Sequence, residues 1–249
     1  MAKIIAFANH KGGVGKTSSV SAIGTLLATR GNRVLLVDLD TQANLTRCHV
    51  DGFPKRLIYH ALREQKDIPV LHVEERLDLV PSGLEMAGIE LQMSGYMQRE
   101  NTLKNLLHEV EGNYDYILLD CPPSLGLITV NALVAANHMV VPMLADTMSF
   151  YGLDMIEEIR DMISKGLNPD IRIDAIFFTK YDPRLSLSSA IKESVENIYH
   201  ERLLKSYVRV NTKIGESPMF HEGVLNGDTD GRSTEDYNKV LDEILARIA

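Results

Sequence analysis

The chain has few of the features that mark secreted or membrane proteins. Two cysteines, Cys48 and Cys121, occur among its 249 residues, and they form no CxxC pair. Because small secreted domains depend on several disulfides, this scarcity favours a reducing compartment, and we expect a cytoplasmic protein. No apolar run reaches the roughly 18 residues of a membrane span, so we expect no membrane partner. The apolar run at residues 4–8 is too short for a signal peptide.

Basic residues are outnumbered by acidic ones. The chain has 34 Asp and Glu against 26 Lys and Arg, and its formal net charge is -8. This balance excludes a protein coated in basic surface, although it allows a local basic patch. Hydrophobic residues make up 45% of the chain, which is enough for a sizeable core, and no linker interrupts it. We therefore predict a single α/β domain over residues 1–249.

A glycine-rich stretch near the N-terminus organises the rest of the chain. It follows the apolar run 4–8 and opens a segment with helical spacing, which is the context of a phosphate-binding loop. Its glycines let backbone N–H groups approach phosphate oxygens. We expect Lys16 to contact the β- and γ-phosphates of a bound nucleotide and the Thr17 hydroxyl to bind Mg²⁺. The residues that this pattern predicts to hold the nucleotide are Gly12, Gly13, Val14, Gly15, Lys16, Thr17 and Ser18.

Lys11 departs from the plain phosphate loop, GxxxxGK[ST]. The first glycine of that pattern would stand at position 10, where this chain has His10, and a second lysine precedes Lys16 by five residues. In this the loop resembles the deviant Walker A loop of the ParA/MinD family of P-loop ATPases. The resemblance implies that Lys11 reaches across a dimer interface to the other subunit's phosphates, which makes both lysines catalytic. A solvated loop cation is the alternative.

Two acidic residues end the next buried strand. The apolar run 34–37 leads into Asp38 and Asp40, and the segment 38–44 matches the D-x-D-x-Q-x-N switch region of the same family. A fully apolar strand with carboxylates at its C-terminal end fits a parallel sheet. The resemblance implies that Asp40 orients the attacking water and that Asp38 supports the loop near the metal. Two plain acidic residues at a strand end are the alternative.

A second strand ends in an acid at Asp120. The apolar run 116–119 before it gives the Walker B pattern, so we expect Asp120 to accept a hydrogen bond from a Mg²⁺-bound water or from Thr17. Residues 120–124 resemble the D-x-P-P-S signature of the family. We expect Cys121 to be a buried small hydrophobe rather than a nucleophile, because no histidine or basic partner adjoins it. Ser124 is predicted to cap a helix over 124–137.

Residues 179–182, Thr-Lys-Tyr-Asp, allow two interpretations. A Thr-Lys-x-Asp motif reads guanine in some GTPases, where the carboxylate pairs with the base edge. ParA-like ATPases also carry Thr-x-x-Asp here, followed by Arg-x-x-Leu-Ser, and this chain continues with a similar segment containing Arg184. We favour ATP, because Lys11 and the D-x-P-P-S segment are family-level signals and Thr-Lys-x-Asp is only four residues.

A cation-rich stretch follows between residues 201 and 213. Residues 208–218 resemble the family's V-P-R-N-V-R-x-x-E-A-P segment, so Asn211 is expected near the adenine base. Arg209 replaces a proline there and is a second candidate for nucleotide contact. Arg184 and Lys213 occupy positions that match DNA-binding arginines of ParA proteins, and such contacts would be strongly salt-dependent. Solvated surface cations are the alternative for this group.

Periodicity and the resemblance together predict a doubly wound, mostly parallel sheet of about seven or eight strands flanked by helices. Outside the motifs, we expect strands at 77–80, 139–143 and 173–178. We expect helices at 84–94, 100–110, 151–165, 187–203 and 237–249, and a loop at 226–236. The last helix carries acids beside its apolar face, so we expect it to dock on the core rather than on a membrane.

The function implied by the resemblance is that of a partition ATPase. ATP and Mg²⁺ would drive a sandwich homodimer that binds double-stranded DNA without sequence preference and so associates with the nucleoid. A ParB-like protein bound to centromere sites would stimulate slow hydrolysis and release the dimer. Two rivals remain: a MinD-like ATPase that acts on a membrane or other cargo, and a GTP-dependent targeting switch. An iron–sulfur reductase is disfavoured, because its pair of ligand cysteines is absent.

Overall fold

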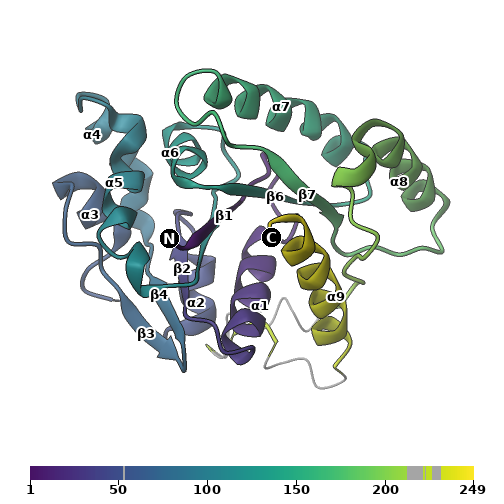
Figure 1. The fold of residues 1–249 in the computed structure, drawn as a ribbon, viewed down its shortest axis with the longest axis horizontal. Helices are drawn as coiled ribbons and strands as arrows, with labels where there is room; N and C mark the ends of the chain where they lie inside the picture. Colours follow the sequence, from purple (N-terminus) through teal and green to yellow (C-terminus); the bar gives the residue numbers. More distant parts are fainter. Residues whose placement is uncertain (53, 212–220, 222, 226–230) are drawn as a thin grey trace.

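A twisted sheet sandwiched between two layers of helices forms the body of the protein (Figure 1). The computed structural model describes residues 1–52, 54–211, 221, 223–225 and 231–249. Within these residues the sheet has seven strands in the order β3-β4-β2-β5-β1-β6-β7. The strands are β1 (Lys3–Phe7), β2 (Val34–Asp38), β3 (Leu71–Glu74), β4 (Leu77–Val80), β5 (Tyr116–Asp120), β6 (His138–Met143) and β7 (Ile173–Phe178).

All neighbouring strands pair in parallel except β3, which lies antiparallel to β4 at one edge. The doubly wound, mostly parallel sheet expected from the sequence is therefore confirmed. Strand β1 lies inside the sheet between β5 and β6, so the loop that follows it opens at the carboxyl edge of the central strands. Ligands of open α/β sheets bind at this edge.

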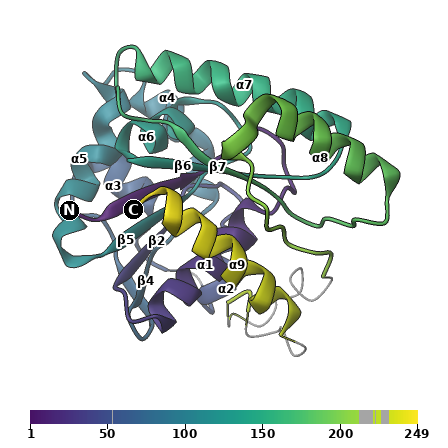
Figure 2. The same cartoon turned by 45° about the vertical axis from the view of Figure 1, so that its right-hand side comes forward.

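Helices cover both faces of the sheet (Figure 2). One face carries three helices: α1 (Lys16–Thr29), α2 (Asn44–His49) and α9 (Arg232–Arg247). The other carries the remaining six α-helices of the described residues: α3 (Ile58–Glu64), α4 (Ile89–Met93), α5 (Thr102–His108), α6 (Leu127–Ala135), α7 (Thr147–Ser164) and α8 (Ser186–Tyr199). Short 3₁₀ turns extend several of them: η1 (Leu84–Gly88), η2 (Arg99–Asn101), η3 (Glu111–Asn113) and η4 (His200–Arg202).

Two hydrophobic cores follow from the alternation of side chains along the strands. In β1, Ile4 and Ala6 join the core under α3–α8, whereas Ile5 and Phe7 join the core under α1, α2 and α9. All four side chains are buried. The continuous apolar runs in the sequence are thus explained by burial on both faces of the sheet.

The C-terminal helix docks on this second core, as its composition predicted. Its apolar side chains Tyr237, Val240, Leu241 and Ile244 are buried, and α9 packs against α1. In the described part of the chain, no helix is long and apolar enough to cross a membrane.

Several boundaries differ from the sequence-based expectations. Ser124 does not cap a helix: α6 begins at Leu127 after Gly126, and the Ser124 carbonyl instead accepts a hydrogen bond from Thr129 Oγ1. Helix α7 begins at Thr147 rather than 151, because Asp146 caps it by accepting from the Ser149 N–H. Helix α8 ends at Tyr199, and a 3₁₀ turn replaces its predicted last turn.

The C-terminal and edge elements also differ. The predicted loop 226–236 is wrong at its end, since α9 already begins at Arg232, while residues 226–230 lie outside the described part of the chain. No element was predicted between residues 46 and 76, where the structure has most of α2, all of α3 and the edge strand β3. Short elements of this kind leave too few residues for a periodic pattern to be recognised.

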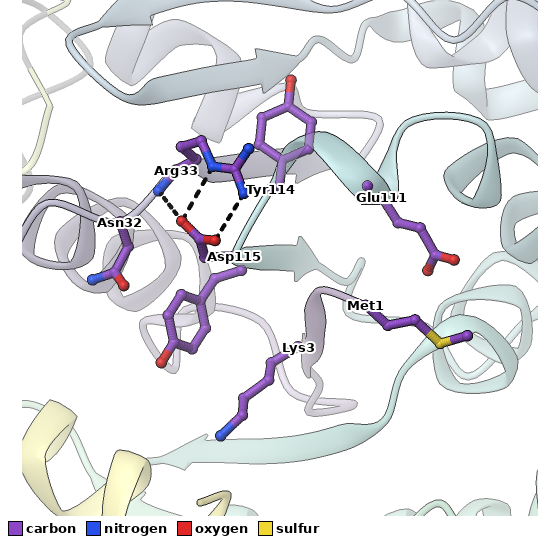
Figure 3. A pocket seen from close by; sticks show the side chains of 9 residues that line it. Met1, Lys3, Asn32, Arg33, Glu111, Tyr114 and Asp115 are labelled. Atoms are coloured by element: carbon purple, nitrogen blue, oxygen red, sulfur yellow. Dashed lines mark hydrogen bonds and ion pairs between the residues drawn. The ribbon is translucent and has the colours of Figure 1, made fainter.

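The amino edge of the sheet is closed by polar pairs at the starts of β2 and β5 (Figure 3). Arg33 donates to Asp115 through its backbone N–H at 2.8 Å and through its guanidinium at 3.0 Å. These residues line a shallow hollow together with Lys3, whose Nζ donates to the Ile248 carbonyl at 2.7 Å. The hollow lies opposite the carboxyl edge, so it is separate from the glycine-rich loop.

Gly24 provides a test of the packing of α1 on the sheet. A Cβ at this position would lie 2.5 Å from Leu36 Cδ2, a buried atom of β2. We expect Gly24→Ala to lower the free energy of unfolding, because overpacking costs about 1–3 kcal/mol and outweighs the gain of about 1 kcal/mol in helix propensity. Urea unfolding measures the change. Gly95→Ala, where an added Cβ meets no atom within 4 Å, is the control and should be nearly neutral.

Candidate nucleotide-binding site

The glycine-rich loop connects the end of β1 to the start of α1. Gly13 and Gly15 adopt positive φ angles of 75° and 85°, a conformation that favours glycine. A Cβ on Gly15 would also lie 3.3 Å from Thr179 Cγ2. The Thr179 hydroxyl donates to the Val14 carbonyl at 2.7 Å, which ties the loop to the end of β7. The loop is therefore held in a fixed shape at the N-terminus of α1, where backbone N–H groups favour an anion.

The two lysines of the loop have different surroundings. Lys16 is buried, and its Nζ donates to the carbonyls of Asn9 at 3.0 Å and Lys11 at 3.2 Å. Burial lowers the pKa of the Lys16 ammonium below its ordinary value, while the nearby Asp120 carboxyl opposes this. Lys16 thus places a positive charge inside the loop.

Lys11 instead reaches away from the loop to the start of α7. Its Nζ forms an ion pair with Asp146 at 2.7 Å, and both side chains are about one-third exposed, at 28% and 34%. The Lys11 backbone N–H donates to Asn9 Oδ1, and the Asn9 amide donates to the Pro142 carbonyl. The charge of Lys11 is therefore near the surface, held by a partner on another element.

Two buried carboxylates lie side by side at the carboxyl edge of the sheet. Asp38 of β2 pairs in register with Asp120 of β5, and Phe7 of β1 also pairs with Asp120. Asp38 is fully buried and Asp120 is 1% exposed. The strand ends that the sequence marked as acidic therefore meet directly beside the loop, as parallel strands require.

The Asp120 carboxylate fits a metal site. Among the described residues, neither of its buried oxygens accepts a hydrogen bond of normal geometry. Burial raises the pKa of Asp120 well above its ordinary value and the Asp38 charge raises it further, while the Thr17 hydroxyl and Lys16 act in the opposite direction. Hard oxygen donors with free lone pairs suit Mg²⁺, so Thr17 and Asp120 match the expected ligand chemistry.

Asp38 differs from Asp120 because its carboxylate is fully engaged. Its Oδ2 accepts from the Thr46 N–H at 2.8 Å and the Thr46 hydroxyl at 2.7 Å, and its Oδ1 accepts from the Asp40 N–H at 3.1 Å. Burial nevertheless raises the pKa of Asp38 to about 6, despite these hydrogen bonds. Asp38 therefore shapes the segment that carries Asp40, whose own side chain is partly exposed.

The segment after β7 bears on the choice between adenine and guanine. Asp182 accepts from the Arg184 guanidinium at 2.7 and 2.9 Å and from its backbone N–H at 3.0 Å. These hydrogen bonds lower the pKa of Asp182 to about 2. To bind a guanine base, the Asp182 carboxylate would first have to break its hydrogen bonds with Arg184. Arg184, the predicted DNA contact, is itself 86% exposed at this position.

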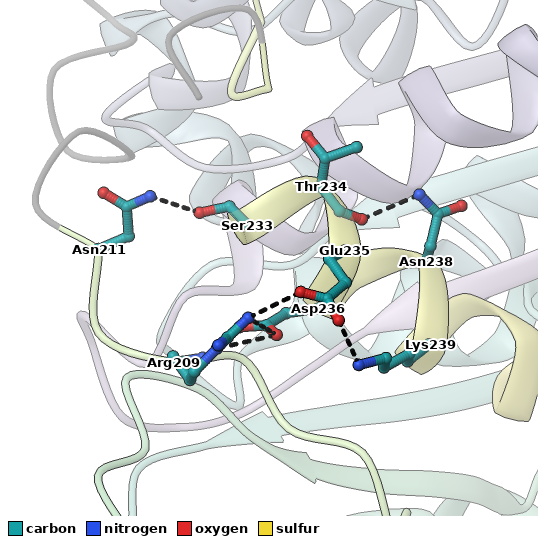
Figure 4. Close-up of polar contacts among 8 residues, drawn as sticks. All are labelled: Arg209, Asn211, Ser233, Thr234, Glu235, Asp236, Asn238 and Lys239. Atoms are coloured by element: carbon teal, nitrogen blue, oxygen red, sulfur yellow. Dashed lines mark hydrogen bonds and ion pairs between the residues drawn. The ribbon is translucent and has the colours of Figure 1, made fainter. Parts of the chain in front are cut away.

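The predicted base contacts lie beside the first turn of α9 (Figure 4). Arg209 pairs with Asp236 and Glu235, and its pKa is raised mainly by the hydrogen bonds to Asp236. Asn211 Nδ2 donates to Ser233 Oγ at 2.7 Å. Both residues therefore hold their segment against α9. Lys213 lies outside the described residues, so its predicted role in DNA binding stays a prediction.

Sequence reasoning missed several residues that build this site. Thr46 holds Asp38, Asn9 holds the backbone of Lys11, and Lys180 Nζ donates to the Gly13 carbonyl at 3.2 Å. Asp146 pairs with Lys11 across 135 positions of sequence. The pattern Asp-x-x-Ser at 146–149 could have indicated a helix cap there, but not the ion pair.

Cys121 has the buried, structural position that the sequence predicted, and His49 is buried as well. Cys121 is 1% exposed, and burial raises the pKa of its thiol above the ordinary value. His49 is buried and its Nε2 shares a hydrogen bond of 2.8 Å with Ser21 Oγ. In the described part of the chain, no group of three or more His, Cys, Asp or Glu residues is arranged to hold a metal ion.

The features described so far define a P-loop nucleotide-binding fold: a mostly parallel sheet, a glycine-rich loop at a helix N-terminus, a buried lysine in that loop, and buried carboxylates at the strand ends. A family model described as an AAA domain (AAA_31) matches residues 2–173. The sporulation initiation inhibitor protein Soj of Bacillus subtilis is 35% identical over 253 residues, covering 99% of both chains. The chromosome-partitioning ATPase Soj of Treponema pallidum is 34% identical and covers 99% of this chain and 98% of its own.

Solved structures agree with this class. A putative plasmid partition protein of Borrelia burgdorferi B31 bound to AMPPNP matches with a TM-score of 0.82 at 27% identity, covering 98% of both chains. Cobyrinic acid a,c-diamide synthase of Mycobacterium smegmatis with bound ADP and magnesium matches with a TM-score of 0.80 at 30% identity, covering 94% of this chain and 98% of that one. The chain belongs to the ParA/Soj family of partition ATPases.

Asp38 predicts a pH dependence of stability in the absence of nucleotide and Mg²⁺. Folding raises the pKa of Asp38 from its ordinary 3.8 to about 6, so the folded state binds this proton more tightly than the unfolded chain does. Its stabilising contribution is full below about pH 4 and is lost as the pH rises through about 6. We expect the free energy of unfolding of the wild type, relative to Asp38→Asn, to fall by roughly 2–3 kcal/mol over this range.

Urea unfolding at a series of pH values measures this difference. Asp170→Asn, which changes an exposed carboxyl after α7, is the matched control and should run parallel to the wild type. Parallel curves for the wild type and Asp38→Asn would contradict the assignment of the raised pKa to Asp38.

Proposed function

We propose that this chain is an ATP-dependent DNA partition ATPase that works as a nucleotide-bound homodimer. The observation that carries the proposal is the arrangement of its two loop lysines. Lys16 is enclosed beside Asp120, whereas Lys11 lies near the surface with its charge directed to Asp146. Within one subunit, Lys16 contacts the bound nucleotide. Lys11 can contact the nucleotide of a second subunit once its ion pair with Asp146 breaks.

The residues at the loop have distinct roles in this proposal. The backbone of residues 12–18 and the Lys16 ammonium bind the phosphates of ATP, and Thr17 and Asp120 hold Mg²⁺. When bound, Mg²⁺ supplies positive charge that offsets the negative charge of the phosphates. Asp40 orients water, held in place through Asp38. The solved relatives with AMPPNP and with ADP and magnesium support ATP and Mg²⁺ as the ligands.

Catalysis in such a site is electrostatic and positional. Lys16 neutralises charge from its own subunit and Lys11 from the other, so a complete site requires two copies. In the monomer Lys11 is held at Asp146, so we expect slow hydrolysis without a partner. A stimulating ParB-like protein would act by changing this arrangement.

Binding to DNA completes the proposal. In this proposal the exposed guanidinium of Arg184, which pairs with Asp182, contacts DNA phosphates together with Lys213, and the nucleoid is then the place of action. The names of the Soj and plasmid partition relatives support this assignment. The membrane-bound alternative receives no support from α9, whose apolar face is already buried against α1. The guanine alternative requires Asp182 to leave Arg184.

Substitution of Lys11 tests the dimer. We expect Lys11→Ala to stay monomeric with ATP and to lose about a hundredfold in hydrolysis rate, because a charge placed for the transition state is removed. Sedimentation with ATP and phosphate release measure the two effects. Lys165→Ala, at the exposed end of α7, is the control and should behave as the parent. Unchanged pairing and turnover of Lys11→Ala would overturn the shared site.

DNA binding is tested with random-sequence duplex in the presence of ATP or ADP. We expect binding with ATP only, and a several-fold loss of affinity in Arg184→Ala that grows in the double variant with Lys213→Ala. Each lost phosphate contact should lower the slope of log K against log salt by about 0.9. Arg63→Ala, an exposed arginine of α3, serves as control. Binding that ignores the nucleotide would refute the partition function.

A further inference from the structure

The first half of the Thr-Lys-x-Asp segment contacts the glycine-rich loop. Thr179 follows β7 directly and is 2% exposed, and its hydroxyl donates to the Val14 carbonyl at 2.7 Å. The Lys180 ammonium donates to the Gly13 carbonyl at 3.2 Å. Two consecutive residues after β7 therefore bind two consecutive carbonyls of the loop, across 165 and 167 positions of sequence.

Both contacts start from a fixed part of the fold. The Thr179 N–H donates to the Met143 carbonyl at the end of β6 at 2.8 Å, and the Tyr181 N–H donates to the Val208 carbonyl at 2.9 Å. Lys180 lies between them with a φ of 50°, a left-handed conformation that is uncommon for a residue with a side chain. Its two neighbours hold it in this conformation, and such backbone conformations concentrate at functional sites.

The direction of a loop carbonyl determines the direction of the N–H group beside it. In a trans peptide, the C=O of one residue and the N–H of the next point to opposite sides. The Gly13 carbonyl shares a peptide with the Val14 N–H, and the Val14 carbonyl shares the next one with the Gly15 N–H. Because residues 179 and 180 hold both carbonyls on their own side of the loop, the two N–H groups face the other side.

The second half of the Thr-Lys-x-Asp segment has a different partner. The Asp182 carboxylate accepts from the Arg184 guanidinium at 2.7 and 2.9 Å. A segment that reads guanine would present its lysine and its carboxylate to the base. Here the ammonium of Lys180 binds a loop carbonyl and the carboxylate of Asp182 binds an arginine, so the motif is engaged with the protein itself.

We propose that Thr179 and Lys180 are positioning residues of the nucleotide site, which act through the loop rather than on the nucleotide. By holding the carbonyls of Gly13 and Val14, they point the N–H groups of Val14 and Gly15 at the phosphates. Donors that are already oriented before the ligand binds need no reorganisation. Loop N–H groups cradle the α- and β-phosphates, so the effect is the same for ADP and ATP. This proposal rests on the phosphate-binding role of the loop in the proposed function, and is independent of DNA binding and of the dimer.

Nucleotide affinity in the absence of turnover tests this role. The probes are the fluorescent analogues mant-ADP and mant-AMPPNP with Mg²⁺. We expect Thr179→Val to raise both Kd values about tenfold, and Lys180→Met about threefold because its hydrogen bond is longer and exposed. Thr179→Ser and Lys180→Arg keep a donor at each position, so their Kd values should stay within about twofold of the wild type.

Two matched variants on α5 serve as controls. Thr102→Val removes another buried hydroxyl that donates to a backbone carbonyl, and Lys104→Met removes another exposed ammonium. Both should change Kd less than about twofold. Urea unfolding without nucleotide monitors the fold. Lys180→Met should unfold as the wild type does, because the residue is exposed, and its weaker binding is then not a loss of structure.

Four results would count against the proposal. Wild-type Kd values in both Thr179→Val and Lys180→Met would exclude a role for the two contacts and leave the nucleotide site in place. A loss with mant-AMPPNP alone would place Lys180 on the γ-phosphate. Asp182→Asn should bind as the wild type does, and a loss equal to that of Thr179→Val would show that the segment acts on the base. If the wild type binds neither probe, the nucleotide site itself is refuted, and this proposal with it.

Discussion

The close pairing of Asp38 and Asp120 is the constraint on which the carboxyl edge of this protein depends. Parallel register places both carboxyls at the ends of adjacent strands, where burial disfavours their charge. Asp38 is stabilised by Thr46, whereas the Asp120 oxygens accept no hydrogen bond of normal geometry from the described residues. The charge of the enclosed Lys16 partly compensates Asp120. Lys16 therefore offsets only part of the negative charge at these strand ends. In the proposed function, Mg²⁺ offsets the rest.

In the proposed function, the second lysine links the site to a partner molecule. Lys11 is held at Asp146 by an ion pair that is about one-third exposed, and such pairs contribute roughly 0–1 kcal/mol. A weak pair of this kind holds the charge without preventing its release. Because Asp146 also caps α7, the position of that helix and the state of Lys11 are connected.

Local pattern predicted the elements around the loop and the acidic strand ends well. The sequence from β1 into α1 and the acids at Asp38 and Asp120 follow from glycine spacing, apolar runs and chain order, all of which are short-range. The cap assigned to Ser124 failed because the residue before the first helical residue, Leu127, is Gly126. The edge strand β3 was missed because it has four residues and is only partly buried.

What the sequence determined by itself is the class of the protein: a phosphate loop on a parallel sheet with carboxylates at one edge and a second loop lysine. Only the tertiary structure decided what those groups touch. Lys11 meets Asp146 across 135 residues, and Arg184 engages the carboxylate of the Thr-Lys-x-Asp motif. The tertiary structure also decided which face of α7 is exposed. Such pairings depend on how helices pack against the sheet, and contacts between distant residues leave no periodic trace in a single chain.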